Sequence, residues 1–140
     1  MLPDNTITYD DTLDVLNDFT LESQPSYTFA LRFETDNRIK GYVDDIEAIK
    51  QAIYLILNTE RYEYLIYSRA YGIELLDLFG KDSRYVVAVL PTRIKEALTQ
   101  DDRINDVTDF EFEVNKNKVF VKFTAVTEYA EIQSELEVNI

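Results

Sequence analysis

The segment Asp44–Gly80, DDIEAIKQAIYLILNTERYEYLIYSRAYGIELLDLFG, decides the fold of this chain. Its first part predicts an amphipathic helix with Asp44 as N-cap and Glu47 as a capping-box partner. The apolar stripe of this helix recurs at helical spacing, at Ile46, Ile49, Ile53 and Ile56. The helix ends at the polar group Asn58-Thr59-Glu60-Arg61. Residues 62–67 resemble a strand in composition but are short, and residues 72–79 predict a short helix ending at Gly80.

The residues before this segment predict a β-hairpin. Residues 26–34 alternate, which indicates a half-buried strand whose apolar face carries Tyr27, Phe29, Leu31 and Phe33. Residues 35–37 are typical of a turn, and residues 38–43 return as the second strand, with Gly41 at a bulge or close approach. Residues 1–25 are polar and acidic and are interpreted as an N-terminal arm, either docked or frayed. Residues 26–140 then form a single domain.

A third helix is predicted from Asp82 or Ser83 to about Thr99, with Pro91 inside it. A proline within a helix removes one hydrogen bond and costs roughly 3 kcal/mol. The alternative is a strand over residues 85–90 followed by a helix that begins at Pro91. The residues alone leave both alternatives open.

The last third of the chain reads as strands. Apolar and acidic residues alternate over 110–114, a turn is expected at 115–118, and 119–127 form the return strand. Residues 135–140 alternate again, which predicts a strand at a sheet edge with charged residues on its other face. The predicted class is α+β, with two or three helices on a small mixed β-sheet, an N-terminal arm and C-terminal strands at the sheet edge.

Composition narrows the function classes. The chain has 140 residues, enough for one domain, and a formal net charge of −13, which disfavours binding to nucleic acid or anionic membranes. It has no cysteine and no histidine, so disulfides, the usual zinc sites and histidine-based catalysis are excluded. No cofactor or metal is expected. Neither a signal peptide nor a membrane-spanning run is recognisable, so the cytoplasm of the cell that makes the protein is the expected location.

Few side chains suggest chemistry. Glu60, Glu63 and Glu74 are the candidate acid/base carboxylates, but nothing in the sequence places a pair of them at a cleft, as a glycosidase requires. Glu60 and Arg61 form either an exposed pair or a partly buried one that ties the helix end to a loop or a partner. Arg103 follows a helix and precedes a strand, so the same two interpretations apply to it.

Residues 41–80 resemble the signature of XkdS-type baseplate proteins of contractile-tail phages and defective prophages. The stretch RIKEAL at 93–98, followed by DDRI at 101–104, continues the match, which extends from about Tyr27 to the C-terminus. This group is similar to the lysozyme-like baseplate wedge proteins, also called sheath initiators. Their Glu-Pro-Arg motif falls on Asp101, Asp102 and Arg103, and because the proline is absent here only Arg103 carries over. Their Thr/Gly-Glu-Arg and Tyr-Gly elements match Thr59-Glu60-Arg61 and Tyr71-Gly72.

The resemblance implies a non-enzymatic assembly protein of a contractile tail baseplate, in a virion or a tail-like particle. It would join the wedge to the tube and initiate sheath polymerisation by β-strand augmentation. Its partners would be baseplate wedge, tail sheath and tube proteins, with multiple copies in the baseplate. The resemblance also favours a continuous helix through Pro91. The alternative function is a carboxylate-dependent peptidoglycan hydrolase. The implied partner-binding residues are Thr59, Glu60, Arg61, Tyr71, Gly72, Asp101, Arg103, Leu136, Val138 and Ile140.

Overall fold

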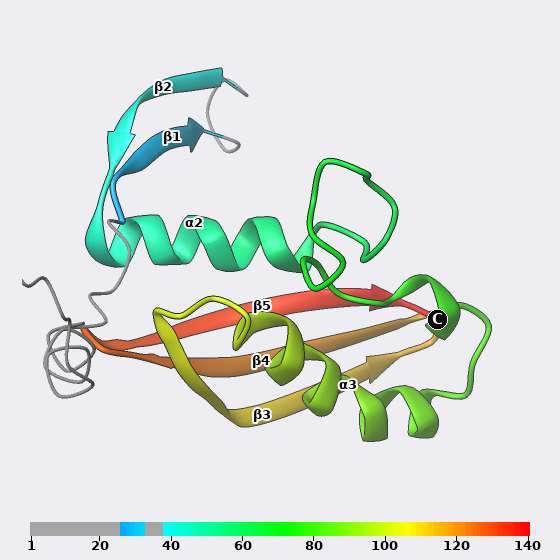
Figure 1. The fold of residues 1–140 in the computed structure, drawn as a ribbon. Coiled ribbons are helices and arrows are strands. Elements are labelled where there is room, and N and C mark those ends of the chain that lie inside the picture. Colours follow the sequence, from blue (N-terminus) through cyan, green and yellow to red (C-terminus); the bar gives the residue numbers. More distant parts are fainter. Residues whose placement is uncertain (1–25, 33–37) are drawn as a thin grey trace, which may run out of the picture.

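The computed structural model describes residues 26–32 and 38–140, and its helices and strands lie in an α+β arrangement (Figure 1). In order they are β1 (Thr28–Arg32), β2 (Arg38–Val43), α2 (Asp45–Leu57), the 3-10 helix η1 (Leu76–Leu78), α3 (Ser83–Leu98), β3 (Ile104–Asn115), β4 (Lys118–Thr127) and β5 (Glu131–Asn139). The predicted α+β class is confirmed. The arm over 1–25 lies outside the described residues, so the division into arm and domain stays a prediction.

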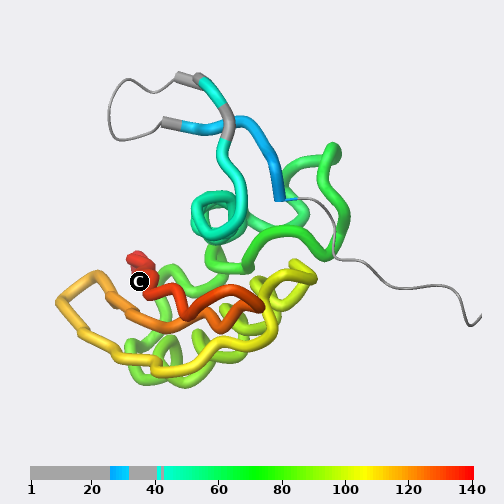
Figure 2. Tube along the Cα trace, turned by 90° about the vertical axis from the view of Figure 1, so that its left-hand side faces the viewer, coloured from blue at the N-terminus to red at the C-terminus, as the bar shows by residue number. Residues whose placement is uncertain are grey.

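The strands form a hairpin, β1-β2, and a three-stranded sheet in the order β3-β4-β5. All three strand pairs are antiparallel, so the expectation of a mixed sheet was wrong. The hairpin lies on the opposite side of α2 from the sheet (Figure 2). One core cluster joins apolar residues of α2, α3 and one face of the three-stranded sheet.

The register of β4 with β5 follows from their alternating patterns. Core residues face one another in the pairs Val119↔Val138 and Val121↔Leu136, whereas Lys122↔Glu135 lies on the outer face. A one-residue slip would turn every buried side chain outward, so this alternation fixes the pairing. The predicted turn at 115–118 and the strand at the sheet edge with charged residues on its outer face are confirmed.

The helices follow the predicted boundaries with one exception. Asp44 caps α2 by accepting the amide of Asp45, but Glu47 bonds to Lys50 rather than completing a capping box. The helix α3 runs without a break through Pro91, which confirms the continuous helix. The helix predicted over 72–79 is instead the single turn η1, and residues 62–67 form turns rather than a strand.

The predicted apolar face of β1 is largely exposed, and a residue of its other face is buried instead. Tyr27 and Phe29 are 62% and 58% exposed, whereas Ala30 is buried. The small Ala30 side chain permits a close approach, and Gln51 of α2 bonds to the outer edge of β1. Its Oε1 accepts the amide of Leu31 at 2.9 Å, and its Nε2 donates to the carbonyl of Phe29 at 2.8 Å. Phe33 lies outside the described residues.

The predicted bulge at Gly41 is confirmed. Phe29 pairs with Tyr42 and Leu31 with Ile39, so β2 contains one extra residue between these pairs. Gly41 has a φ of 80°, the left-handed conformation that such bulges place at a glycine.

Candidate functional site

The segment after α2 is closed by a short parallel bridge between Glu60 and Ile73. The amide of Arg61 donates to the carbonyl of Ile73 at 3.1 Å, and the amide of Ile73 donates to the carbonyl of Thr59 at 3.0 Å. Gly72 has a φ of 94°, and a Cβ there would lie 2.5 Å from the carbonyl oxygen of Thr59. Only glycine fits this crossing, which explains why the first half of the predicted 72–79 helix does not form.

The carboxylate of Glu60 caps the start of η1. It accepts the amide of Leu75 at 3.0 Å and the amide of Leu76 at 3.1 Å. Backbone amides at a helix start are favourable partners for an anion, so this carboxylate has a structural role. Of the other two candidate acids, Glu63 is exposed and Glu74 lies 4.0 Å from Nη1 of Arg61.

Arg61 is partly buried, as one of its two interpretations predicted, with 10% of its side chain exposed. Its Nε and Nη2 donate to the carbonyl of Gly72 at 3.4 and 3.3 Å. Its Nη1 donates to Glu96 of α3 at 3.1 Å. The guanidinium therefore ties the end of α2 to the crossing at Gly72 and to α3.

A second arginine, on α3, holds the same segment, and no role was predicted for it beyond its place in the RIKEAL stretch. Arg93 bonds to the carbonyl of Glu74 at 2.7 Å and to both oxygens of Asp77, at 2.5 and 2.8 Å. The hydrogen bond from Arg93 lowers the pKa of Asp77. Sixteen residues separate the partners, so spacing along the chain could not have revealed the pair. We define the internal network as Glu60, Arg61, Gly72, Asp77 and Arg93.

Arg103 lies outside this network and bonds to Asp101 in a two-pronged contact. Its Nε donates to Oδ1 at 2.8 Å and its Nη2 to Oδ2 at 2.6 Å, while its backbone amide also donates to Oδ1 at 3.0 Å. Burial acts to raise the pKa of Asp101, but the hydrogen bonds from Arg103 outweigh it and the pKa is lowered. The planar guanidinium is well matched to such a carboxylate.

Tyr71 joins this pair in a groove of about 560 Å³ between the start of β1, α2 and the loop after α3. We call it the Arg103 groove; it is lined by Tyr71, Asp101 and Arg103 together with Ala48 and Gln51 of α2. The ring of Tyr71 stacks on Tyr67 at 4.6 Å, and burial is the main cause that raises the pKa of Tyr71. Of the predicted residues of this region, the internal network thus contains Glu60, Arg61 and Gly72, and the Arg103 groove contains Tyr71, Asp101 and Arg103. Thr59 contributes its carbonyl to the bridge with Ile73.

The loop between these two groups presents apolar side chains to solvent, which the sequence did not predict. Leu65 is fully exposed, Ile66 is 86% exposed, and Tyr62 and Tyr64 are more than half exposed. Tyr62 has a φ of 69°, so the loop begins in a left-handed conformation that a bulky residue rarely adopts.

The predicted residues of β5 are mainly core. Leu136 and Val138 are buried against the sheet's inner face, and Ile140 donates its amide to the carbonyl of Asn117 at 2.8 Å. This bond and the bond from the amide of Thr127 to the carbonyl of Ala130 at 3.1 Å lie at the two ends of β5, and both involve even-numbered residues, Ala130 and Ile140. Because hydrogen-bonded pairs alternate in an antiparallel ladder, the even-numbered residues of β5 direct their amides and carbonyls to β4. The backbone groups of the odd-numbered residues therefore point away from β4. We call these groups the β5 edge; they belong to Glu131, Gln133, Glu135, Glu137 and Asn139.

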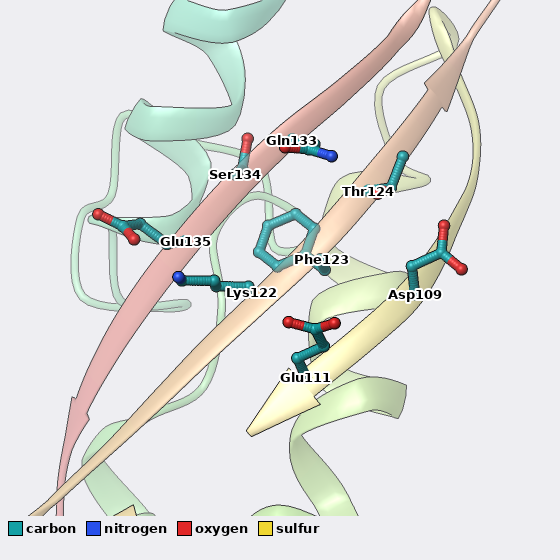
Figure 3. A pocket seen from close by; sticks show the side chains of 8 residues that line it. All are labelled: Asp109, Glu111, Lys122, Phe123, Thr124, Gln133, Ser134 and Glu135. Carbon is teal, nitrogen blue, oxygen red and sulfur yellow. The ribbon is translucent and has the colours of Figure 1, made fainter. Parts of the chain in front are cut away.

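The outer face of the sheet is acidic and hollowed. A groove of about 670 Å³ crosses the three strands, and Asp109, Glu111 and Glu135 lie along it with Lys122 (Figure 3). Asp109 sits at a bulge in β3, with a φ of 56°, where the register shifts between Thr108 and Glu111. In residues 26–32 and 38–140 no group of three or more acidic side chains is placed to hold a metal ion. None of the helices described there is long and apolar enough to cross a membrane.

Comparison with known proteins gives two matches. Residues 27–130 match the family model of the contractile injection system sheath initiator. The chain is also 36% identical over 124 residues to the phage-like element PBSX protein XkdS of Bacillus subtilis (strain 168), which covers 84% of this chain and 88% of that protein. The family match spans the bridge at Glu60, the residues named for the Arg103 groove, and the strands β3 and β4, and the chain belongs to the contractile injection system sheath initiator family.

Proposed function

We propose that this protein joins the baseplate wedge to the tail tube and starts sheath polymerisation by accepting an extended strand on the β5 edge. Its family gives it a structural role in a contractile tail. The observation that carries the finer proposal is the edge itself, because β5 pairs with β4 alone among the described strands. A strand edge with unpaired amides and carbonyls can accept a further strand.

The sheet has a second edge, at β3, but that strand is a poorer acceptor. Its register with β4 shifts twice, between Ile104 and Asp106 and between Thr108 and Glu111. Bulges of this kind bend a strand and interrupt its row of backbone groups. By contrast, β5 pairs with β4 without interruption over nine residues. A regular edge offers a partner an unbroken row of hydrogen bonds.

We propose that the baseplate wedge binds at the Arg103 groove. Arg103 is 17% exposed and Tyr71 is half-buried, so both border the groove without being fully enclosed. Arginine and tyrosine in a partly desolvated recess are typical of residues that dominate protein interfaces. Glu60 and Arg61 would then support this site from within rather than touch the wedge.

A proline placed on the β5 edge tests sheath initiation. Because the amide of Gln133 points away from β4, Gln133→Pro removes a donor from the edge and leaves the β4 ladder intact. We expect this variant to keep its fold and to leave tubes without ordered sheath, whereas the matched control Gln133→Thr assembles normally. Ordered sheaths on a folded Gln133→Pro protein would reject strand addition at this edge.

Arg103→Ala tests the wedge contact. We expect the purified variant to fold but to enter baseplates poorly, and Arg84→Ala, an exposed arginine on α3, to enter them normally. If Arg103→Ala folds and builds baseplates as well as Arg84→Ala does, the wedge assignment is wrong.

The proposed role is non-enzymatic. The carboxylate of Glu60, one of the three candidate acids, accepts hydrogen bonds from two backbone amides, which supports this part of the proposal. Zymography on peptidoglycan checks it directly. Clearing by the purified protein that is lost in Glu60→Gln would favour a hydrolase instead.

A further inference from the structure

We propose that the strand accepted by β5 alternates apolar and basic side chains. This inference rests on the proposed function, since it describes the partner of the same edge. The two faces of β5 present different chemistry to any neighbour along the edge.

The outer face of β5 is acidic. Glu131, Glu135 and Glu137 are exposed on it, with Gln133 between them. A strand bonded to the β5 edge places every second side chain on this face, directly beside these residues. Opposite charges at such positions stabilise a strand pair and like charges destabilise it. Basic side chains therefore suit these positions.

Two lysines of β4 share this face but leave the acidic character in place. Lys118 bonds to Glu137 at 2.5 Å, and Lys122 lies across from Glu135 in the register. Both lysines belong to β4, on one side of β5, whereas an added strand would lie on the other side and place its own side chains directly beside the glutamates. Glu111 and Glu113 of β3 add further negative charge beyond the lysines.

The inner face at the end of β5 is apolar and incompletely covered. A groove of about 540 Å³ lies there between η1 and the last residues of the sheet, and its apolar lining is Leu75, Leu76, Phe79, Val138 and Ile140. Leu76 and Phe79 are 70% and 73% exposed. Inward-facing side chains of an added strand would extend the core over these two residues, which favours apolar residues at the alternate positions.

The same two faces disfavour a second copy of this chain as the occupant. Pairing β5 with another β5 would bring glutamates of both outer faces together, at positions where like charges repel. The alternating pattern also suits an added strand of either direction, because side-chain alternation does not depend on strand polarity.

Three labelled nine-residue peptides test the pattern against the full chain. One alternates isoleucine and lysine, one alternates isoleucine and glutamate, and one has the composition of the first with the lysines in a block. Fluorescence anisotropy at low salt should show the isoleucine–lysine peptide binding at least about tenfold more tightly than either control. The block peptide accounts for non-specific attraction to a chain of net charge −13.

Variants locate the binding. Phe79→Ser and Glu135→Lys should each weaken binding of the isoleucine–lysine peptide several-fold, while Leu65→Ser, at a still more exposed apolar position on another loop, should leave it unchanged. Equal binding of the glutamate or block peptide, or binding that both variants leave unaltered, would overturn the inference. A dimer of the isolated protein held together at β5 would overturn it too.

Two outcomes distinguish the residue pattern of the partner from strand addition itself. If the Gln133→Pro protein fails to initiate sheath while the three peptides bind equally well, strand addition at β5 is supported and the alternating pattern of the partner is rejected. If the Gln133→Pro protein initiates normal sheath, the proposed function itself is rejected.

Discussion

The internal network and the β5 edge use polar groups in opposite ways. In the network, side chains and backbone satisfy one another: the carboxylate of Glu60 accepts amides at the start of η1, Arg61 donates to the carbonyl of Gly72, and Arg93 donates to Asp77. At β5 the side chains on the inner face are core, and the backbone groups of the odd-numbered residues point outward without a described strand beside them. Glu60, Arg61 and Gly72 thus build the scaffold, whereas the proposed sheath-binding edge at β5 consists of main-chain groups.

This contrast changes how the resemblance to sheath initiators is interpreted. The Thr-Glu-Arg and Tyr-Gly elements meet in space, with Gly72 crossing the backbone of Thr59. Their immediate physical role is to hold the crossing closed. Their role in partner binding stays a prediction. We expect these elements to act on partner binding indirectly, by fixing the shape of the loop and of the Arg103 groove.

The largest effect is expected from Gly72→Ala. The new Cβ would lie 2.5 Å from the carbonyl oxygen of Thr59, in a backbone conformation of φ 94°. We expect a loss of at least about 3 kcal/mol in the free energy of unfolding, measured with urea. Gly80→Ala is the matched control, because Gly80 has a φ of 79° but nothing within 4 Å of its added Cβ, and it should cost only about 1 kcal/mol. Equal losses would show that the crossing does not constrain the loop.

A smaller loss is expected from Arg61→Ala, which leaves the carbonyl of Gly72 and the carboxylate of Glu96 without this partner. We expect about 2 kcal/mol of destabilisation, since hydrogen bonds to charged groups contribute about 1.5–3 kcal/mol each and Glu96 is largely solvated. Urea unfolding beside Arg84→Ala provides the comparison. An Arg61→Ala protein of unchanged stability that fails to assemble would place Arg61 at a partner instead of in the scaffold.

The smallest expected effect is on the pH dependence of stability, and it tests the pair of Asp101 and Arg103 in the Arg103 groove apart from the internal network. The folded-state pKa of Asp101 is lowered, so its contribution to stability is present above the unfolded pKa of about 3.9 and is lost as pH falls through the folded value. Urea midpoints of wild type should therefore fall more steeply below about pH 4 than those of Asp101→Asn. Glu128→Gln, an exposed site, should keep the wild-type slope. Parallel curves for wild type and Asp101→Asn would show that the pair with Arg103 contributes nothing to folding.

Much of the architecture could be predicted from local patterns. The isoleucine spacing and Asp44 defined α2, and alternation defined β4 and the last strand, because burial of one face imposes these periods. The pattern could not say which face of the hairpin packs. Tyr27 and Phe29 are the larger residues, yet the small Ala30 is buried, since α2 approaches that side and Gln51 bonds to the strand edge.

The site was predictable only in part. Asp101 and Arg103 lie two residues apart, so their pairing was within reach of sequence reasoning. The partners of Arg61 and Arg93 lie 35 and 16 residues away, and such contacts depend on how α3 crosses the loop. The short η1 was missed for a similar reason: helix propensity over 72–79 was overridden by the bridge between Glu60 and Ile73.

Amide hydrogen exchange of β5, compared between the free protein and assembled sheath, shows whether a strand is added at this edge. We expect the odd-numbered amides, those of Gln133, Glu135 and Glu137, to exchange fast in the free protein and at least about tenfold more slowly after assembly. The even-numbered amides, already bonded to β4, should be protected in both states. Odd-numbered amides that exchange as fast in assembled sheath as in the free protein would contradict strand addition at β5.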